Sequence, residues 1–375
     1  MNRMEAIGSP ARVALKKMPI AFLPKTAYTY SGRFPEKREE NKKRAYKENA
    51  MQKATVVIPN YNGMKFIKEC LESLLEQDIP LSEYHILVVD NGSTDGSRQL
   101  IEDAFPDVSL IALSSNTGFC HAVNAGIEAA ATPYVILLNN DTKVHPRFVR
   151  ALCDSMDARP EAFAVNANMR IWDRPELMDD AGDRYCALGW AYARGKGRPA
   201  ARYDSPAEIF SACGGAAIYR KSILEEIGLF DEGHFAYLED LDIGYRARIY
   251  GYRSFYEPAA QVIHYGSASS GSRYNEWKTE LAAANSIYVI AKNMPILQWI
   301  WNLPFLLPGF LVKFLFFCGK RMGILYLKGL WNGVKKSLSR EGRERKVPFR
   351  WEHLGNYLAI QGQLYANTLR ILKKS

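Results

Sequence analysis

Polar side chains follow three apolar segments of this chain, at the point where each segment ends. Residues 54–58 lead into Pro59-Asn-Tyr-Asn-Gly63, residues 85–89 into Asp90-Asn-Gly-Ser-Thr-Asp-Gly-Ser97, and residues 134–138 into Asn139-Asn-Asp-Thr142. Short apolar runs bounded by turn residues are typical of buried parallel strands, whose carboxyl ends meet at one edge of the sheet. Carboxylate oxygens there are ligands that Mg²⁺ accepts. The spacing therefore predicts one site suited to a nucleotide diphosphate and a divalent cation.

The segments around these clusters predict the elements that position them. Apolar residues recur at helical spacing over 65–76. Further helices are expected after Ser97 and over 118–131, 222–227 and 239–250, with strands over 108–113, 254–256 and 261–263. This order predicts an α/β fold with a doubly wound, mostly parallel sheet. Residues 160–215 show no clear pattern, and the Gly/Arg-rich stretch 194–198 is either a mobile flap or an ordinary connection.

Six motifs in order resemble those of the family 2 inverting glycosyltransferases of GT-A fold, over about residues 54 to 293. They are Asp90-Asn-Gly-Ser-Thr-Asp95, Asn116-Thr-Gly-Phe-Cys-His-Ala-Val-Asn124, Asn139-Asn140-Asp141, Gly214-Gly215, Glu239-Asp240 and His264-Tyr-Gly-Ser267. The resemblance implies that Asp90 contacts the nucleoside of a nucleotide-sugar donor. It implies a donor-binding set of Pro59, Asn62, Asp90, Asn91, Asn116, Gly118, Asn124, Asn139, Asn140 and Gly215.

Asn139-Asn140-Asp141 gives the most specific metal signal. Three polar residues directly after five apolar ones are hard to explain by packing, although a plain turn stays open. Mg²⁺ or Mn²⁺ bridging two phosphates needs only one or two protein oxygens, and Asp141 would supply the charged one. The resemblance adds His264 as a second ligand. It also places Asn139 where the family usually has an acid, a departure found among members that use dTDP-linked deoxysugars such as rhamnose.

Glu239 and Asp240 begin a predicted helix, where capping and the helix dipole also favour acids. An inverting transfer needs a carboxylate to take the proton of the acceptor hydroxyl. Adjacent helical side chains point about 100° apart, so the two acids cannot share this task. The resemblance makes Asp240 the base, with Glu239 orienting it or the sugar. Gly214-Gly215 would allow close approach of the sugar, or simply tight packing.

Charge is unevenly distributed along the chain. Residues 1–53 contain 13 Lys/Arg and five Glu, and residues 287–375 contain 15 Lys/Arg and three Glu, whereas the segment between them is acidic. An acidic body argues against nucleic acid as a partner, and basic ends beside apolar residues favour an anionic membrane surface. Six cysteines without regular spacing indicate neither a zinc site nor a disulfide framework, which favours the cytosol.

Three regions are therefore expected. Residues 1–53 form a basic, disordered extension, residues 54–293 the GT-A domain, and residues 294–375 a helical, membrane-associating region. Residues 293–312 are uncharged and apolar, but Pro295, Pro304 and Pro308 are expected to break the helix repeatedly. This favours an element that lies in or re-enters the membrane interface over a clean span, with buried core as the alternative. Residues 335–350 are expected to be a basic linker and 351–375 a last amphipathic helix.

The sequence thus predicts an inverting glycosyltransferase that moves a sugar from a nucleotide-diphosphate donor, such as dTDP-rhamnose or another NDP-hexose, to a hydroxyl of a lipid-linked or surface polysaccharide. Mg²⁺ or Mn²⁺ is the expected cofactor, and the inner face of the cell membrane the expected location. A non-catalytic, membrane-associated scaffold that binds nucleotide sugars is the alternative. A nicotinamide oxidoreductase is disfavoured because no G-x-G-x-x-G follows the first predicted strand.

Overall fold

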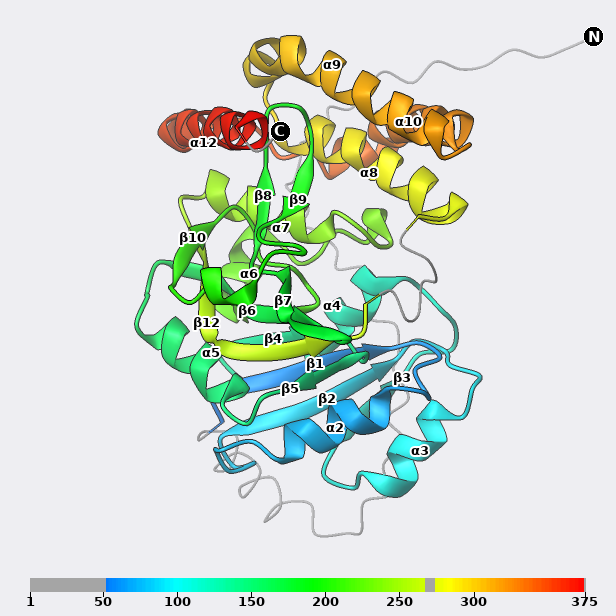
Figure 1. Ribbon diagram of the computed structural model, residues 1–375, viewed down its shortest axis with the longest axis vertical. Helices are drawn as coiled ribbons and strands as arrows, with labels where there is room; N and C mark the ends of the chain where they lie inside the picture. Colours follow the sequence, from blue (N-terminus) through cyan, green and yellow to red (C-terminus); the bar gives the residue numbers. More distant parts are fainter. Residues whose placement is uncertain (1–51, 267–273, 374–375) are drawn as a thin grey trace, which may run out of the picture. The chain divides into compact units, whose positions relative to one another are not determined.

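A mixed sheet forms the core of the protein (Figure 1). The computed structural model describes residues 52–266 and 274–373, so the predicted extension lies, apart from its last two residues, outside the described part. Strands of the sheet run in the order β10-β12-β6-β11-β4-β1-β2-β3, with β5 paired to β12 and β7 to β6. Their bounds are β1 (Ala54–Asn60), β2 (Tyr84–Asp90), β3 (Ser109–Ala112), β4 (Tyr134–Leu138), β5 (Thr142–Val144), β6 (Ala162–Ile171), β7 (Arg174–Asp180), β10 (Ala207–Ile209), β11 (Ala216–Arg220) and β12 (Arg253–His264).

The pairing confirms a mostly parallel, doubly wound sheet. β1 lies parallel to both β2 and β4, and its register places Asn60 opposite Asp90 at the carboxyl ends of two strands. β11 runs antiparallel between β4 and β6. The two short strands expected over 254–256 and 261–263 are one strand, β12, whose pairing to β6 shifts register between Glu257 and Gln261.

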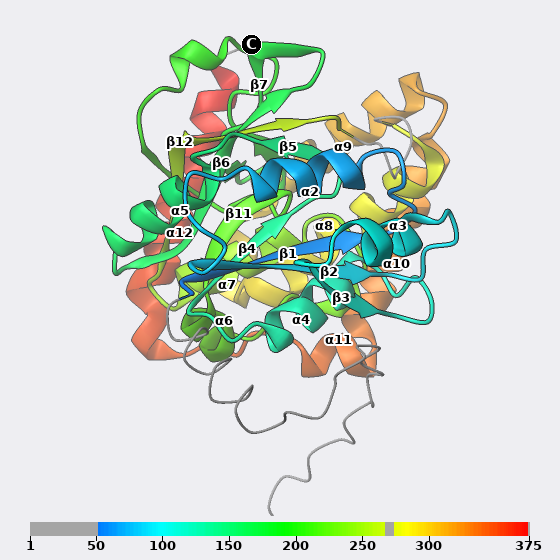
Figure 2. The ribbon, with the colours of Figure 1, turned by 90° about the horizontal axis from the view of Figure 1, so that it is seen from below.

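Helices cover both faces of the sheet (Figure 2). Alternate residues of a strand point to opposite faces, so Val56 and Ile58 of β1 belong to one apolar cluster and Val57 to another. The first cluster includes α2 (Ile67–Leu75), α3 (Ser97–Ala104) and α5 (Phe148–Asp157). The second includes α4 (Phe119–Ala129), α6 (Lys221–Ile227) and α7 (Glu239–Ile249).

Residues 160–215 contain strands that their sequence did not reveal. β6 is buried along most of its length on both faces, which removes the alternation that marks a half-exposed strand. A hairpin of β8 (Asp183–Tyr185) and β9 (Ala191–Ala193) follows β7. The stretch 194–198 packs on its neighbours: its backbone hydrogen-bonds that of Met178, and Arg194 lies over the rings of Tyr203 and Tyr256, which favours an ordinary connection over a mobile flap.

The C-terminal region consists of α8 (Glu276–Asn293), α9 (Ile296–Gly319), α10 (Gly323–Leu338), α11 (Arg340–Glu344) and α12 (Leu354–Leu372). The prediction that prolines break the apolar segment is confirmed for Pro295, which separates α8 from α9, but it was wrong for Pro304 and Pro308, because α9 continues through both. Each proline removes one backbone hydrogen bond, but tertiary contacts hold α9 on both sides of the pair. Asn302 exchanges two 2.8 Å hydrogen bonds with Gln361, and the Gly309 carbonyl accepts one from Trp190.

Two further expectations for this region have different outcomes. The basic linker expected over 335–350 is wrong in part, since α10 extends to Leu338 and α11 follows it. The last helix is confirmed as α12, preceded by a short 3₁₀ turn over Trp351–His353. α9 is long and apolar enough to cross a membrane by length and composition, with about a sixth of its most apolar window buried (17%).

Candidate active site

Asn60 joins the carboxyl ends of three strands. Its side-chain amide donates to Asp90 Oδ1 at 3.0 Å and to Ser97 Oγ at 3.0 Å, and its Oδ1 accepts from Asn140 at 2.8 Å. Asn60 itself is completely buried. Because Asn60, Asp90 and Asn140 come from the ends of β1, β2 and β4, this network holds the three predicted clusters in one place.

A cavity of about 840 Å³ opens beside this network. Its volume lies within the range of roughly 300–1,000 Å³ typical of small-molecule sites. Eight residues predicted for the donor or the metal line this cavity: Pro59, Asn91, Asn116, Gly118, Asn139, Asn140, Gly215 and His264. Asp141, Glu239 and Asp240 line the same cavity. The three polar clusters therefore meet at one cavity, as their positions at the strand ends predicted.

Three predicted donor residues lie outside this lining. Asp90 is buried and accepts hydrogen bonds from Asn60 and from the backbone N–H of Ser93, so it orders the strand ends. Asn62 accepts from the backbone N–H of Thr94 at 2.9 Å. Asn124 pairs with the backbone of Phe230 through both its amide atoms, at 2.8 and 3.0 Å. The structure thus gives these side chains contacts that shape the surrounding loops.

Asp141 and His264 face each other at the cavity wall. His264 Nε2 lies 3.3 Å from Asp141 Oδ1, and His264 Nδ1 lies 2.8 Å from Asp179 Oδ2. Burial alone would lower the pKa of His264, but its hydrogen bonds to the two carboxylates raise that pKa to about 9. β5 and β12 pair here, with Thr142 opposite His264, which explains how distant residues meet.

Glu239 and Asp240 differ in their surroundings although they are neighbours. Burial, followed by the negative charge of Asp240, raises the pKa of Glu239 well above its ordinary value. Burial also raises the pKa of Asp240, but the backbone N–H groups of Leu241 and Gly214 oppose this and the pKa reaches only about 6. At neutral pH, Asp240 is therefore mostly ionised, whereas Glu239 is shifted strongly toward its protonated form. Pairs of acids whose pKa values are separated in this way are typical of acid–base sites.

Asp183 of the β8–β9 hairpin is a site residue that the sequence analysis missed. Its side chain hydrogen-bonds that of Asp240 and lines the same cavity. Burial and the charge of Asp180 raise the pKa of Asp183 well above its ordinary value, which favours a protonated carboxyl as the donor to Asp240. The signal was present as three acids in the five residues Asp179-Asp-Ala-Gly-Asp183, but no element could be predicted there.

The loop before α7 is strained. Phe235, Tyr237 and Leu238 have positive φ angles of 61°, 66° and 65°, which cost energy for residues other than glycine. Asn285 of α8 holds this loop by donating to the backbone carbonyls of residues 234, 236 and 237 at 2.9–3.0 Å. Lys336 of α10 donates to the carbonyl of residue 233. C-terminal helices therefore fix the conformation of the loop that leads into Glu239 and Asp240.

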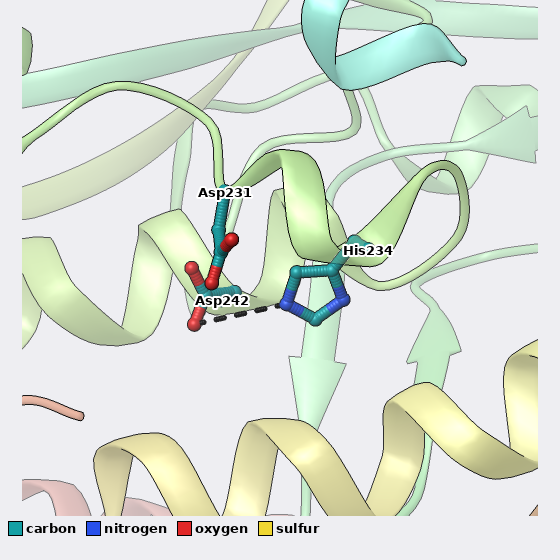
Figure 3. A group of neighbouring side chains, drawn as sticks. All are labelled: Asp231, His234 and Asp242. Carbon is teal, nitrogen blue, oxygen red and sulfur yellow. Dashed lines mark ion pairs between the residues drawn. The ribbon is translucent and has the colours of Figure 1, made fainter. Parts of the chain in front are cut away.

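A buried ionic network lies behind α7. Asp231, His234 and Asp242 point toward one another, with ligand atoms within 4.8 Å (Figure 3). Lys292 Nζ of α8 contacts both carboxylates, at 2.7 Å from Asp231 and 2.8 Å from Asp242. Burial alone would raise the pKa of these aspartates, but the charge of Lys292 keeps both values well below the usual range.

We interpret this network as a clamp between α7 and α8 and not as a metal centre. The Lys292 ammonium already supplies a cation between the two carboxylates, and Arg345 and Arg246 pair with Asp231 and Asp242. Burial lowers the pKa of His234 to about 3, so its imidazole is neutral. None of these side chains lines the 840 Å³ cavity.

Comparison with known proteins identifies the family of the chain. The model of the family "Glycosyl transferase family 2" matches residues 55–228. The chain is 31% identical over 241 residues to the N-acetylglucosaminyl-diphospho-decaprenol L-rhamnosyltransferase of Mycobacterium tuberculosis, covering 58% of this chain and 77% of that protein. It is 25% identical over 203 residues to the poly-beta-1,6-N-acetyl-D-glucosamine synthase of Staphylococcus epidermidis, covering 53% of this chain and 47% of that protein.

A solved structure shares the fold. The crystal structure of GalNAc-T7 with UDP, GalNAc and Mn²⁺ superposes with a TM-score of 0.53 at 15% identity, covering 64% of this chain and 48% of that one. The chain thus spans about half the length of that structure. The expected GT-A architecture and the resemblance in sequence are both confirmed. The chain belongs to glycosyltransferase family 2 and is a glycosyltransferase.

Proposed function

We propose that the protein transfers a sugar from a nucleotide-diphosphate donor to a hydroxyl group with inversion, and that Asp240 is the general base. One observation carries this proposal: Asp240, with a pKa of about 6, lines the same cavity as the Asp141–His264 pair and the amides at the strand ends. A base with a pKa close to the working pH combines ionisation with proton affinity. The scaffold alternative does not require such a separation of pKa values between Glu239 and Asp240.

The residues present fit a divalent cation. Asp141 offers a carboxylate oxygen, and His264 would offer an imidazole nitrogen once an incoming cation displaces its proton; both residues line the cavity. The hydrogen bond between His264 Nδ1 and Asp179 fixes the orientation of the ring, as carboxylates commonly do for metal-ligating histidines. Oxygen and imidazole ligands suit Mn²⁺ and, less well, Mg²⁺. When bound, the cation would offset the negative charge of the diphosphate leaving group.

The chain's own groups would carry the proton transfer. Asp240 accepts the proton of the acceptor hydroxyl as that oxygen forms a bond to the anomeric carbon, and the bond from this carbon to the diphosphate breaks. The raised pKa of Asp183 favours its protonated form, which would donate to Asp240 and keep that carboxylate oriented. The pKa of Glu239 is raised in the same direction, so its carboxyl would be available to donate a hydrogen bond to a sugar hydroxyl. Asn91, Asn116 and Asn139 offer amides to the donor.

The donor and acceptor classes follow from the relatives. The mycobacterial relative is a rhamnosyltransferase acting on a lipid-linked diphospho-sugar, and this chain covers 77% of it. We therefore propose dTDP-rhamnose or another NDP-hexose as the donor. A lipid-linked or surface polysaccharide precursor is the proposed acceptor.

An anionic membrane is the proposed partner of α9, which places the enzyme on the inner face of the cell membrane. Apolar side chains recur at helical spacing on its exposed face, at Ile296, Ile300, Leu303, Leu307, Leu311 and Leu315. The opposite face is held on the protein, where Gln298 accepts a 2.7 Å hydrogen bond from Tyr245 and Asn302 pairs with Gln361. Because α9 is packed on the protein along one side, we propose that it lies on the membrane surface and does not span the membrane.

The proposal is tested by measuring the release of nucleotide diphosphate from a panel of nucleotide sugars. Each donor is supplied with Mn²⁺ and an isoprenyl diphosphate sugar as acceptor. The wild type should turn over at least one donor, and Asp240→Asn should lower turnover by about 10² to 10⁴ with donor affinity nearly unchanged. Binding of a donor without turnover in the wild type would instead support the scaffold.

A further inference from the structure

A second cavity lies in the C-terminal region, separate from the active site. Its volume is about 590 Å³, and it shares no lining residue with the 840 Å³ cavity. The first turn of α9, the segment after α11 and the start of α12 form its wall. Most of the lining is apolar, with Leu297, Trp301, Phe349, Tyr357 and Leu358 among its side chains. An apolar cavity of this size suits a hydrocarbon chain.

Two basic side chains line this apolar cavity. Arg343 and Lys346 belong to its lining, and both side chains are exposed. Within residues 52–266 and 274–373, neither has a carboxylate within 4 Å, whereas Arg345 between them pairs with Asp231. No acidic residue of the described chain belongs to the lining. Together, unpaired cations and an apolar wall match an amphiphile with one anionic head.

The cavity is also continuous with the exposed apolar face of α9. Ile296, which is 76% exposed, belongs to both, and Trp351 at the cavity is 79% exposed. Exposed tryptophan and isoleucine beside basic side chains are typical of a membrane interface. A lipid that left the membrane leaflet in contact with α9 would therefore reach the cavity directly.

We propose that this cavity binds the hydrocarbon chain of an anionic membrane phospholipid, whose phosphate is held by Arg343 and Lys346. The proposal deepens the membrane docking proposed above and rests on it for the source of the lipid. It is independent of catalysis, because none of the residues involved lines the active-site cavity.

A short-chain phosphatidylglycerol kept below its micelle concentration tests the cavity without a bilayer. Binding to the full-length protein is followed by tryptophan fluorescence, since Trp301 and Trp351 line the cavity. The wild type should bind it about tenfold or more tightly than short-chain phosphatidylcholine. The double variant Arg343→Gln, Lys346→Gln should lose about tenfold to a hundredfold in affinity, because two charge-assisted contacts are removed. Both positions are exposed, so the fold should be retained.

The matched control is Lys320→Gln, Lys335→Gln, which removes the same charge from the residue after α9 and from α10, outside the cavity. This control should leave the binding of monomeric phosphatidylglycerol unchanged. An equal loss in control and test variants, or equal affinity for both phospholipids, would overturn the proposal. So would tighter binding of geranyl phosphate than of phosphatidylglycerol, which would point to the acceptor's lipid.

A second measurement separates this proposal from membrane docking. Vesicles of phosphatidylcholine, with and without phosphatidylglycerol, are sedimented with the same variants. If the wild type sediments with anionic vesicles but binds no monomeric lipid, the cavity proposal fails and docking stands. If it binds monomeric lipid but no vesicles, docking fails and the cavity proposal stands.

Discussion

The pH dependence of turnover offers the sharpest test of the roles given to Glu239 and Asp240. Burial raises the pKa of Asp240 to about 6, while the same cause raises that of Glu239 well above its ordinary value. A base works only when ionised, so activity should be present above the pKa of Asp240 and lost as the pH falls through it. About nine-tenths of Asp240 is ionised at roughly pH 7 and about one-tenth at roughly pH 5, which predicts a roughly ninefold fall in kcat/KM.

The assay is nucleotide-diphosphate release with subsaturating donor and acceptor, measured across the acid and neutral range. In Glu239→Gln, the acidic limb of the pH profile of kcat/KM should stay near pH 6, because a neutral amide resembles the protonated acid that it replaces. Asp183→Ala should move the limb to higher pH, because the hydrogen bond from Asp183 lowers the pKa of Asp240. Asp240→Asn should abolish most of the turnover, and the remaining activity should no longer fall at acid pH.

Two results would refute the assignment. One is an acid limb near the ordinary aspartate pKa of about 4 in the wild type, which would mean that burial does not perturb the base. The other is loss of turnover in Glu239→Gln while Asp240→Asn stays active, which would reverse the two roles. Circular dichroism of each variant checks that the fold is intact.

Three further predictions concern the metal and the C-terminal helices. Asp141→Asn should weaken Mn²⁺-dependent binding of a nucleotide diphosphate by about tenfold or more in calorimetry, since an amide lacks the charge; unchanged affinity would contradict the metal role. Lys292→Met leaves two buried carboxylates without their shared cation and should lower the free energy of unfolding by about 3–5 kcal/mol in chemical denaturation. The control Lys328→Met, at an exposed ion pair, should lower it by less than about 1 kcal/mol. Equal effects of the two variants would refute the clamp. Gly309→Ala places a Cβ against the backbone carbonyl of Leu188 in the β8–β9 hairpin and should lower the free energy of unfolding by about 1–3 kcal/mol in the same measurement. The Cβ of Gly319→Ala meets nothing within 4 Å, so this control should not destabilise the protein.

The parallel half of the fold could be predicted because its signals are local. β1, β2 and β4 are continuous apolar runs that end in turn residues, and α2 carries apolar residues at helical spacing. β6 was missed because a strand buried on both faces has no alternation to detect. The proline argument failed for α9 because intrinsic propensity is weaker than the contacts that hold a helix in place.

The candidate site was predictable in part for the same reason. Asp141 and Asp240 stand out by position, at a strand end and at a helix start, and both line the cavity. Asn124 was assigned to the donor from its motif, yet its amide pairs with the backbone of Phe230, a residue 106 positions away. Asp183 had no predicted element to place it. Motifs identify residues of the right type, but which of them face the cavity depends on contacts that are distant in sequence.

The sequence by itself determined which strand ends carry polar residues, because turn chemistry and apolar periodicity act within a few residues. Only the tertiary structure decided how α7, which begins with Glu239 and Asp240, is supported. Lys292 of α8 contacts Asp231 before α7 and Asp242 within it, and Asn285 of α8 holds the carbonyls of the loop before α7, across 48 to 61 residues of chain. Burial also raises the pKa values of both adjacent acids, Glu239 and Asp240, and backbone hydrogen bonds from Leu241 and Gly214 limit the rise for Asp240. Desolvation depends on every element packed around a group, so it cannot be read from the neighbours of that group in the sequence.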